Sequence, residues 1–147
     1  MKIAIGADHA GYETKEKIKR VLDEMGIEYE DLGTYSPEPV DYPDFGAAVG
    51  KKVAAGEADE GIVICGSGIG IAIAANKIKG IRAAQAWNEE TARLARQHNN
   101  ANVLAIGARV LSEEEIHKIL KAWFETKFEG GRHAKRIEKI KQLEEQQ

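Results

Sequence analysis

The only cysteine of this chain closes an apolar run and is followed by glycine at every second position, in the segment Cys65-Gly66-Ser67-Gly68-Ile69-Gly70. Residues 61–65 are predicted to form a buried strand, and the alanine-rich residues 71–77 are predicted to form a helix. A strand, a glycine turn and a helix N-terminus direct backbone N–H groups and the positive end of a helix dipole at one point. Such a place suits an anion and favours the thiolate form of a cysteine. The segment therefore predicts a base or nucleophile beside a cradle for negative charge.

Simpler interpretations and several known motifs compete with this one. A lone cysteine is often only a small buried apolar residue, and glycine after a strand often serves only a tight turn. Ile71 stands where the dinucleotide fingerprint G-x-G-x-x-G needs its third glycine, and where a cysteine phosphatase needs its arginine. The Lys-Ser/Thr pair of a Walker phosphate loop is also missing. The pattern favours a glycine-rich anion site and argues against a dinucleotide fold, a phosphatase and a kinase.

Length and composition limit the class of protein. The 147 residues suffice for one domain with a real core and are too few for two ordinary domains. The net charge of −3 gives no basic field for nucleic acid, and one cysteine cannot form an internal disulfide. No apolar run is long enough to span a membrane or to form a signal peptide. We expect a single cytoplasmic domain over residues 1–147, with neither nucleic acid nor a membrane as partner.

Strand and helix patterns alternate along the whole chain. Strands are predicted at residues 3–6, 27–32, 61–65, 81–86 and 102–106, and helices at 11–25, 44–55, 71–77, 88–97, from a capping box at 112–115 onward, and at about 131–145. This order predicts an α/β fold, a three-layer α/β/α Rossmann-like sandwich with a five-stranded parallel sheet and an extra C-terminal helix. The apolar stripe of that last helix is thin, so we expect it to dock on a neighbouring subunit.

Polar side chains that can do chemistry follow several of these predicted strands. Ligands of open parallel sheets bind outside the carboxyl ends of the strands, so these residues are the first candidates. They are Asp8 and His9 after the first strand, Cys65, Gly66 and Ser67 after the third, and Arg109 after the fifth. Further candidates are Asp41 and Tyr42 in the long loop 33–43, His98 and Asn99 after a helix, and Arg132 and Arg136 on one helical face. Taken singly, each has a structural explanation, such as helix capping or a solvated surface.

Taken together, these residue types suit proton transfer on a small phosphorylated sugar. Moving a proton between adjacent carbons needs a base and hydrogen-bond donors for an enediolate oxygen, and a phosphate needs guanidinium groups. No metal-ligand spacing is visible, and we expect neither a metal nor a cofactor. A non-catalytic phosphate- or nucleotide-binding domain is the alternative, although it would have no use for Cys65, His98 and Asp8 together.

The chain closely resembles the type B ribose-5-phosphate isomerases, a family that includes the galactose-6-phosphate isomerases of the lactose pathway. The matching motifs span nearly the whole chain: Gly6-Ala7-Asp8-His9-Ala10-Gly11, Asp41-Tyr42-Pro43-Asp44, Cys65-Gly66-Ser67-Gly68-Ile69-Gly70, Ala74-Ala75-Asn76-Lys77, Gly80-Ile81-Arg82-Ala83, Arg96-Gln97-His98-Asn99, Asn102-Val103-Leu104 and Gly130-Gly131-Arg132-His133. The resemblance implies interconversion of an aldose 5-phosphate and its 2-ketose by proton transfer between C1 and C2.

The resemblance also implies a role for each candidate residue. Cys65 is the carbon base, Ser67 and the amides of the glycine loop (Gly66, Gly68, Gly70) hold the enediolate oxygen, and His98 with Asp8 opens the sugar ring. Asp41, Tyr42 and Asn99 orient the sugar hydroxyls, and His9, Arg109, Arg132 and Arg136 bind the phosphate. Family members are dimers or tetramers whose sites take residues from two subunits, which implies a homodimer or homotetramer here.

Two positions separate this chain from other members of the family. One branch lacks the cysteine and uses a glutamate where this chain has Ile71, so the thiol mechanism is the one implied here. Many members with the cysteine have threonine in place of Ser67, and both residues supply a hydroxyl. The expected substrates are ribose 5-phosphate and ribulose 5-phosphate, and the alternative is the same chemistry on a hexose 6-phosphate such as allose or galactose 6-phosphate.

Overall fold

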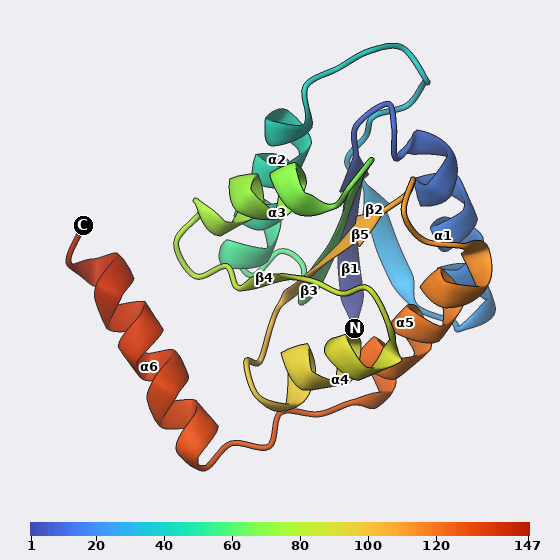
Figure 1. Cartoon of the computed structure of the whole chain (residues 1–147). Coiled ribbons are helices and arrows are strands. Elements are labelled where there is room, and N and C mark those ends of the chain that lie inside the picture. The colour runs from blue at the N-terminus through green and yellow to red at the C-terminus, as the bar shows by residue number, and fades with distance from the viewer.

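Five short runs of the chain form one parallel sheet in the computed structural model, which describes all 147 residues (Figure 1). The strands are β1 (Lys2–Ala7), β2 (Glu28–Asp31), β3 (Glu60–Cys65), β4 (Ala83–Gln85) and β5 (Val103–Gly107), in the order β2-β1-β3-β5-β4. Every neighbouring pair is parallel, and the order reverses between β1 and β3. Ligands of such sheets bind at the carboxyl ends near this reversal.

Helices cover both faces of the sheet, which confirms the predicted three layers. Helices α1 (Tyr12–Glu24), α4 (Glu89–Gln97) and α5 (Glu113–Glu125) pack on one face, against side chains such as Ile62 and Ile64 of β3. Helices α2 (Tyr42–Ala54) and α3 (Ile69–Asn76) pack on the other face, against Val63 and Cys65. Because side chains alternate along a strand, β3 is apolar throughout and places Cys65 beneath α3.

The final helix, α6 (Arg132–Glu145), stands apart from these layers (Figure 1). His133 is its only buried residue, whereas Ile140 and Leu143 remain exposed. One tie near its end is the Gly80 N–H, which donates to a carboxylate oxygen of Glu144 at 2.8 Å. No helix is long and apolar enough to cross a membrane.

The predicted elements all form, with differences at their ends. Strand β4 keeps only three residues of the predicted 81–86. At its first residue, Ala83, the side-chain amide of Asn76 accepts from the backbone N–H at 2.7 Å and donates to the carbonyl at 3.0 Å. Helix α3 begins at Ile69, directly after the glycine turn. The capping box at Ser112 is confirmed, because its hydroxyl accepts from the Glu115 N–H.

Candidate active site

The glycine turn after β3 brings a backbone donor to the only thiol. Cys65 is 4% exposed, and its sulfur accepts a hydrogen bond from the Gly68 N–H at 3.2 Å. Gly68 has a φ of +79°, and a Cβ there would lie 2.9 Å from the Gly107 nitrogen, so the position requires glycine. Helix α3 starts at the next residue and directs its free N–H groups toward the same turn. The turn thus stabilises negative charge at and around the sulfur.

Ser67 lies at the mouth of this turn and is held from two sides. Its hydroxyl oxygen accepts from the Ile69 N–H at 3.1 Å, which leaves its own O–H free to donate. Its carbonyl accepts from the side-chain amide of Gln85, at the end of β4, at 2.6 Å. Sequence reasoning missed Gln85, because a glutamine that ends a predicted strand carries no signal of its own.

A hollow of about 470 Å³ opens over Cys65 at the carboxyl ends of β1 and β3. Its walls include Asp8, His9, Tyr42, Ser67 and Arg109. The structure therefore brings six of the predicted site residues together, counting the thiol, along with Gly66 and Gly70. A carboxylate, an imidazole and a guanidinium around one thiol suit a small, polar, anionic ligand.

Asp8 and His9 follow β1 and point their polar atoms in fixed directions. Asp8 is buried, and one of its oxygens accepts from the Gly11 N–H at 3.0 Å, at the start of α1. The Nδ1 atom of His9 accepts from the Val40 N–H at 3.1 Å. Because Nδ1 also lies 3.2 Å from the Val40 carbonyl oxygen, the backbone of Val40 engages this nitrogen in either tautomer, and Nε2 is left to contact a ligand.

Two glycines let the larger side chains of the hollow come close. A Cβ at Gly70 would lie 2.6 Å from the Tyr42 ring, and a Cβ at Gly66 would lie 3.3 Å from the guanidinium of Arg109. Arg109 is also fixed by its own N–H, which donates to the Gly66 carbonyl at 2.9 Å. Asp41 is exposed at the N-cap of α2 without capping it, and it lies outside the walls of the hollow.

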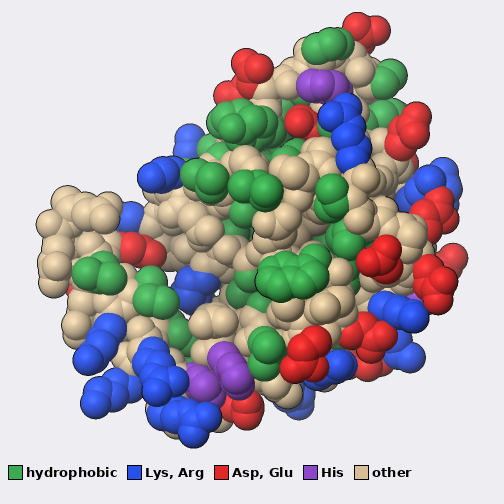
Figure 2. All heavy atoms as spheres, viewed as in Figure 1, with side chains coloured by type: hydrophobic (Ala, Val, Ile, Leu, Met, Phe, Trp, Pro, Cys, Tyr) green, Lys and Arg blue, Asp and Glu red, His purple; other side chains and the backbone are tan.

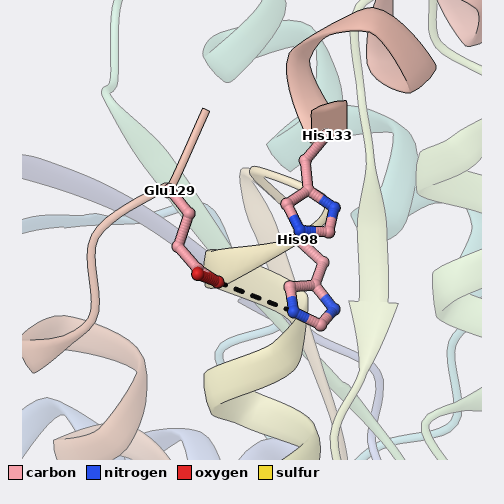
Figure 3. A group of neighbouring side chains, drawn as sticks. All are labelled: His98, Glu129 and His133. Atoms are coloured by element: carbon pink, nitrogen blue, oxygen red, sulfur yellow. Dashed lines mark ion pairs between the residues drawn. The ribbon is translucent and has the colours of Figure 1, made fainter. Parts of the chain in front are cut away.

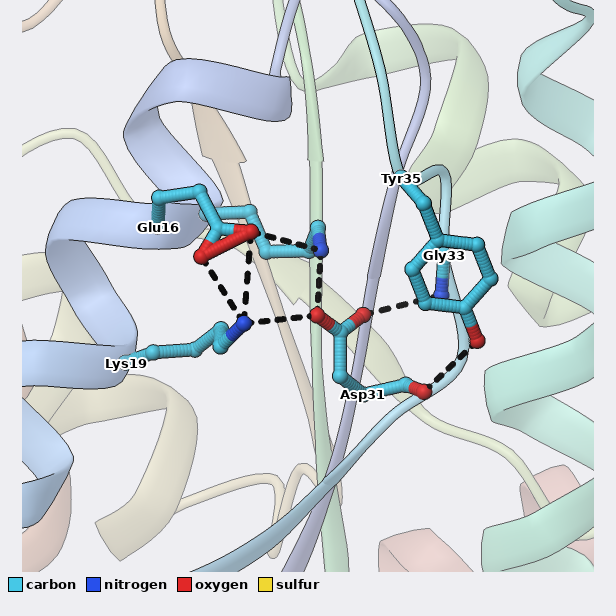
Figure 4. Close-up of polar contacts among 6 residues, drawn as sticks. Glu16, Lys19, Asp31, Gly33 and Tyr35 are labelled. Atoms are coloured by element: carbon cyan, nitrogen blue, oxygen red, sulfur yellow. Dashed lines mark hydrogen bonds and ion pairs between the residues drawn. The ribbon is translucent and has the colours of Figure 1, made fainter.

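A buried charge network holds the start of the loop that carries Asp41 and Tyr42 (Figure 4). Lys15 is fully buried and donates to an Asp31 oxygen at 2.5 Å, and Lys19 donates to the same oxygen at 2.9 Å. The other oxygen of Asp31 accepts from the Gly33 N–H at 2.9 Å, and the Tyr35 hydroxyl donates to the Asp31 carbonyl. Burial acts to raise the pKa of Asp31, but the hydrogen bonds from the two lysines outweigh it and hold that pKa below its ordinary value.

The remaining predicted residues lie at the opposite end of the molecule. His98 caps the C-terminus of α4, and the Glu129 N–H donates to the Gln97 carbonyl at 3.1 Å, which draws the start of α6 to the same place. There the ring of His133 stacks on that of His98, with centroids 4.2 Å apart and an angle of 11° between the planes (Figure 3). Burial, followed by the neighbouring His98 and Arg132, lowers the pKa of His133 below its ordinary value.

Positive charge surrounds this second group of residues. Arg132 and Arg136 are exposed on the first turns of α6, as is Asn99 after α4. Figure 2 shows Lys and Arg side chains gathered beside histidines at the start of that helix. Arg82 fixes the turn after α4, because its Nε donates to the carbonyls of Asn99 and Asn100 at 3.2 and 3.1 Å.

The two groups cannot meet within one chain. Cys65 pairs in register with Gly107 at the carboxyl end of β5, whereas His98 precedes the amino end of that strand at Val103. The four residue steps from Val103 to Gly107 span about 13 Å, while proton transfer needs heavy atoms about 3 Å apart. The expected gathering of all candidates in one place therefore does not occur in a single chain, which instead holds two separate groups of candidate residues at opposite ends of its strands.

Comparisons with known proteins match the chain over nearly its full length. The model of the family described as Ribose/Galactose Isomerase matches residues 3–140. Ribose-5-phosphate isomerase B of Escherichia coli is 49% identical over 144 residues, covering 98% of this chain and 97% of that protein. The structure of ribose-5-phosphate isomerase B from Clostridium thermocellum superposes with a TM-score of 0.98, at 51% identity and over 99% of both chains.

One solved relative holds a ligand. It is ribose-5-phosphate isomerase B from Mycoplasma genitalium with bound ribulose-5-phosphate, at a TM-score of 0.94 and 43% identity, covering 99% of this chain and 97% of that one. A five-carbon sugar phosphate thus binds to a protein of this fold.

Proposed function

The chain belongs to the ribose/galactose isomerase family and, within it, to the type B ribose-5-phosphate isomerases, and on this premise we propose that it interconverts ribose 5-phosphate and ribulose 5-phosphate. The observation that carries the proposal is the Cys65 sulfur, which accepts the Gly68 N–H at 3.2 Å at the floor of a polar hollow. A cysteine that only filled the hydrophobic core would not need a backbone N–H donor at its sulfur or a place in the lining of a hollow.

The proton transfer follows from the order of groups along the turn. The Cys65 thiolate removes the C2 proton of the open-chain aldose, and the electron pair forms the C1–C2 double bond of an enediolate. The Ser67 hydroxyl and the amides of Gly66, Gly68 and Gly70 stabilise its negative oxygen. The thiol returns the proton to C1 while the O2 proton moves to O1, which gives the ketose. The free O–H of Ser67 supports its part in this step.

The sugar ring must open first, and we assign this step to His98 and Asp8 as an acid–base pair. His98 protonates the ring oxygen, and Asp8 takes the proton of the anomeric hydroxyl through the oxygen that Gly11 leaves free. Asp41, Tyr42 and Asn99 orient the sugar hydroxyls. His9, Arg109, Arg132 and Arg136 hold the phosphate, since charge-assisted contacts from guanidinium groups suit phosphate oxygens.

We propose that a homodimer, alone or within a tetramer, completes each site. The hollow of one subunit would receive His98, Asn99, Arg132 and Arg136 of its neighbour. The separation of the two groups of candidate residues along β5 supports this arrangement, because neither group contains all the side chains that the reaction needs. Helix α6, which exposes Ile140 and Leu143, would dock on the second subunit.

The test is isomerisation of ribose 5-phosphate without added metal, followed as ketose formation and as exchange of the C2 proton in heavy water. The wild type should do both, and Cys65→Ala should do neither while still binding the sugar phosphate, because the phosphate contacts lie elsewhere. Near-normal C2 exchange by Cys65→Ala would exclude the thiol as base. A higher kcat/KM for allose or galactose 6-phosphate than for ribose 5-phosphate would overturn the pentose assignment.

A further inference from the structure

Three side chains outside the hollow place metal-binding atoms close together (Figure 3). The Nε2 atom of His98 lies 3.6 Å from a carboxylate oxygen of Glu129, and the ring of His133 stacks on that of His98. One ligand atom from each of the three residues lies within 4.8 Å of the other two. Two ligands of a tetrahedral Zn²⁺ at about 2.0–2.1 Å from the ion lie roughly 3.4 Å apart, close to the observed separation of His98 and Glu129.

The backbone holds these residues in place from two segments, the end of α4 and residues 129–133. His98 ends α4, and the hydrogen bond from Glu129 to Gln97 fixes the approach to α6. Gly130 and Gly131, with φ of +71° and +58°, turn the chain so that His133 returns over His98 in the first turn of the helix. The fold therefore fixes the backbone positions of the three residues.

We propose that His98, Glu129 and His133 form a binding site for Zn²⁺, with a fourth position open to solvent or substrate. Two imidazoles and one carboxylate are a ligand set that zinc takes in proteins, and an open fourth position is common for such sets. The rings of His98 and His133 are nearly parallel, so their nitrogen lone pairs do not point at a common position. One of the two rings must therefore turn before both can bind the same ion. His98 can do this, because its side chain is 38% exposed.

The charges around the site set its strength. Glu129 supplies one negative charge, whereas Arg132 and Arg136 on the same helix add positive charge that opposes a cation. We therefore expect binding in the range of roughly 1–100 μM, weaker than at a dedicated structural zinc site. The fraction of sites occupied would depend on the concentration of free zinc. This is expected of a reversible inhibitory site, whereas a structural zinc site is always occupied.

Inhibition is the functional consequence, and this part rests on the proposed function. An ion on Nε2 of His98 takes the place of a proton on this nitrogen, so His98 could not protonate the ring oxygen from it and Zn²⁺ should block the reaction reversibly. The metal would act here as an inhibitor bound by a catalytic residue, with no part in the proton transfer itself.

The binding test uses Co²⁺ as a spectroscopic probe and Zn²⁺ as its competitor, with the Cys65→Ala protein as host so that the thiol cannot bind either metal. One Co²⁺ per chain should bind with the intense visible absorption of a four-coordinate site, and Zn²⁺ should displace it. Glu129→Gln and His133→Asn should each weaken the binding at least tenfold. His117→Asn is the matched control, because His117 is exposed on α5 outside the cluster and its loss should change nothing.

Equal affinity in the host and in Glu129→Gln would overturn the site, and this variant changes only an exposed side chain, so misfolding cannot explain the result. Loss of binding in His117→Asn would overturn it as well. Wild-type activity on ribose 5-phosphate should fall with zinc and return with a chelator, and Glu129→Gln, which keeps both Cys65 and His98, should need at least tenfold more zinc for the same loss. Equal sensitivity of the two proteins would assign the inhibition to Cys65 and overturn the inhibitory role of the cluster. Confirmed binding without inhibition would overturn the inhibitory role and the assignment of ring opening to His98, while the metal site itself would stand.

Discussion

Mixing two inactive variants should restore activity if each site is shared between subunits. Cys65→Ala removes the proposed base from the hollow, and His98→Asn removes the proposed ring-opening acid from the opposite end of the strands. Each homodimer should be nearly inactive. In a mixed dimer both lesions fall in one site, and the other site keeps an intact Cys65 and an intact His98. The twofold symmetry of the dimer alone produces this result.

The expected magnitude follows from the geometry and from counting. The length of β5, about 13 Å, lies between the ends at which Cys65 and His98 are placed, so these two residues of one subunit cannot serve the same site. Random re-pairing of equal amounts makes about half of the dimers mixed, each with one good site of two. Recovered activity should therefore approach about a quarter of the wild-type value.

The assay is ribose 5-phosphate isomerisation after subunit exchange, with the exchange measured by mass-tagged chains. A mixture of Cys65→Ala with Asp8→Asn is the matched control, because both residues line the same hollow and no pairing gives an intact site. That mixture should stay inactive. Chains that exchange fully and yet give no activity in the first mixture would refute the shared site, as would recovery in the control mixture.

Two further predictions concern the phosphate contacts and the buried charges. Arg132→Ala and Arg136→Ala should each raise KM about tenfold to more than a hundredfold, because the loss of a charge-assisted contact costs roughly 1.5–3 kcal/mol. Steady-state kinetics measures this effect, and a wild-type KM in both variants would exclude α6 from phosphate binding. Asp31→Asn should lower the free energy of unfolding at pH 7 by about 3 kcal/mol, because fully buried Lys15 loses its nearest counter-ion, although the asparagine carbonyl still accepts a hydrogen bond. The lysine partners Lys15 and Lys19 hold the pKa of Asp31 low in the folded state, so its stabilising effect is present above the unfolded pKa of about 3.9 and is lost as the pH falls through the lower folded value. Urea unfolding should therefore show a constant gap between wild type and variant from pH 5 to 8 that narrows below about pH 4, and a gap that persists unchanged to pH 3 would contradict this.

The sequence was sufficient to predict the sheet, the helices and the glycine turn between β3 and α3, because these depend on local patterns. Apolar runs of the right length and the glycines after Cys65 determine a strand, a turn and a helix over a few residues. Asn88 and Ser112 likewise mark helix starts through their own side chains, and both cap as expected. Features of this kind can be recognised from a short stretch of sequence.

Contacts between distant segments could not be predicted in the same way. The Gln85 amide holds the Ser67 carbonyl, and the Lys15 ammonium reaches Asp31 on the neighbouring strand, and neither pair is marked by spacing. The placing of His98 was harder still, because a helix that follows a parallel strand runs back and ends at the amino edge of the sheet. A residue that follows such a helix lies at the amino end of the next strand, whereas a residue that follows a strand lies at its carboxyl end. The two kinds of residue are therefore far apart, although each is next to a strand in the sequence.

The poor burial of α6 and the division of the site have a common explanation in the proposed dimer. An isolated helix of about 12–15 residues is marginal in water, and α6 has 14 residues, of which only His133 is buried. Docking on a second subunit would bury the exposed Ile140 and Leu143 and stabilise the helix. The same docking would bring Arg132 and Arg136 to the neighbour's hollow. Folding of the last helix and completion of the phosphate site would then be a single event, so that an unpaired chain would lack both.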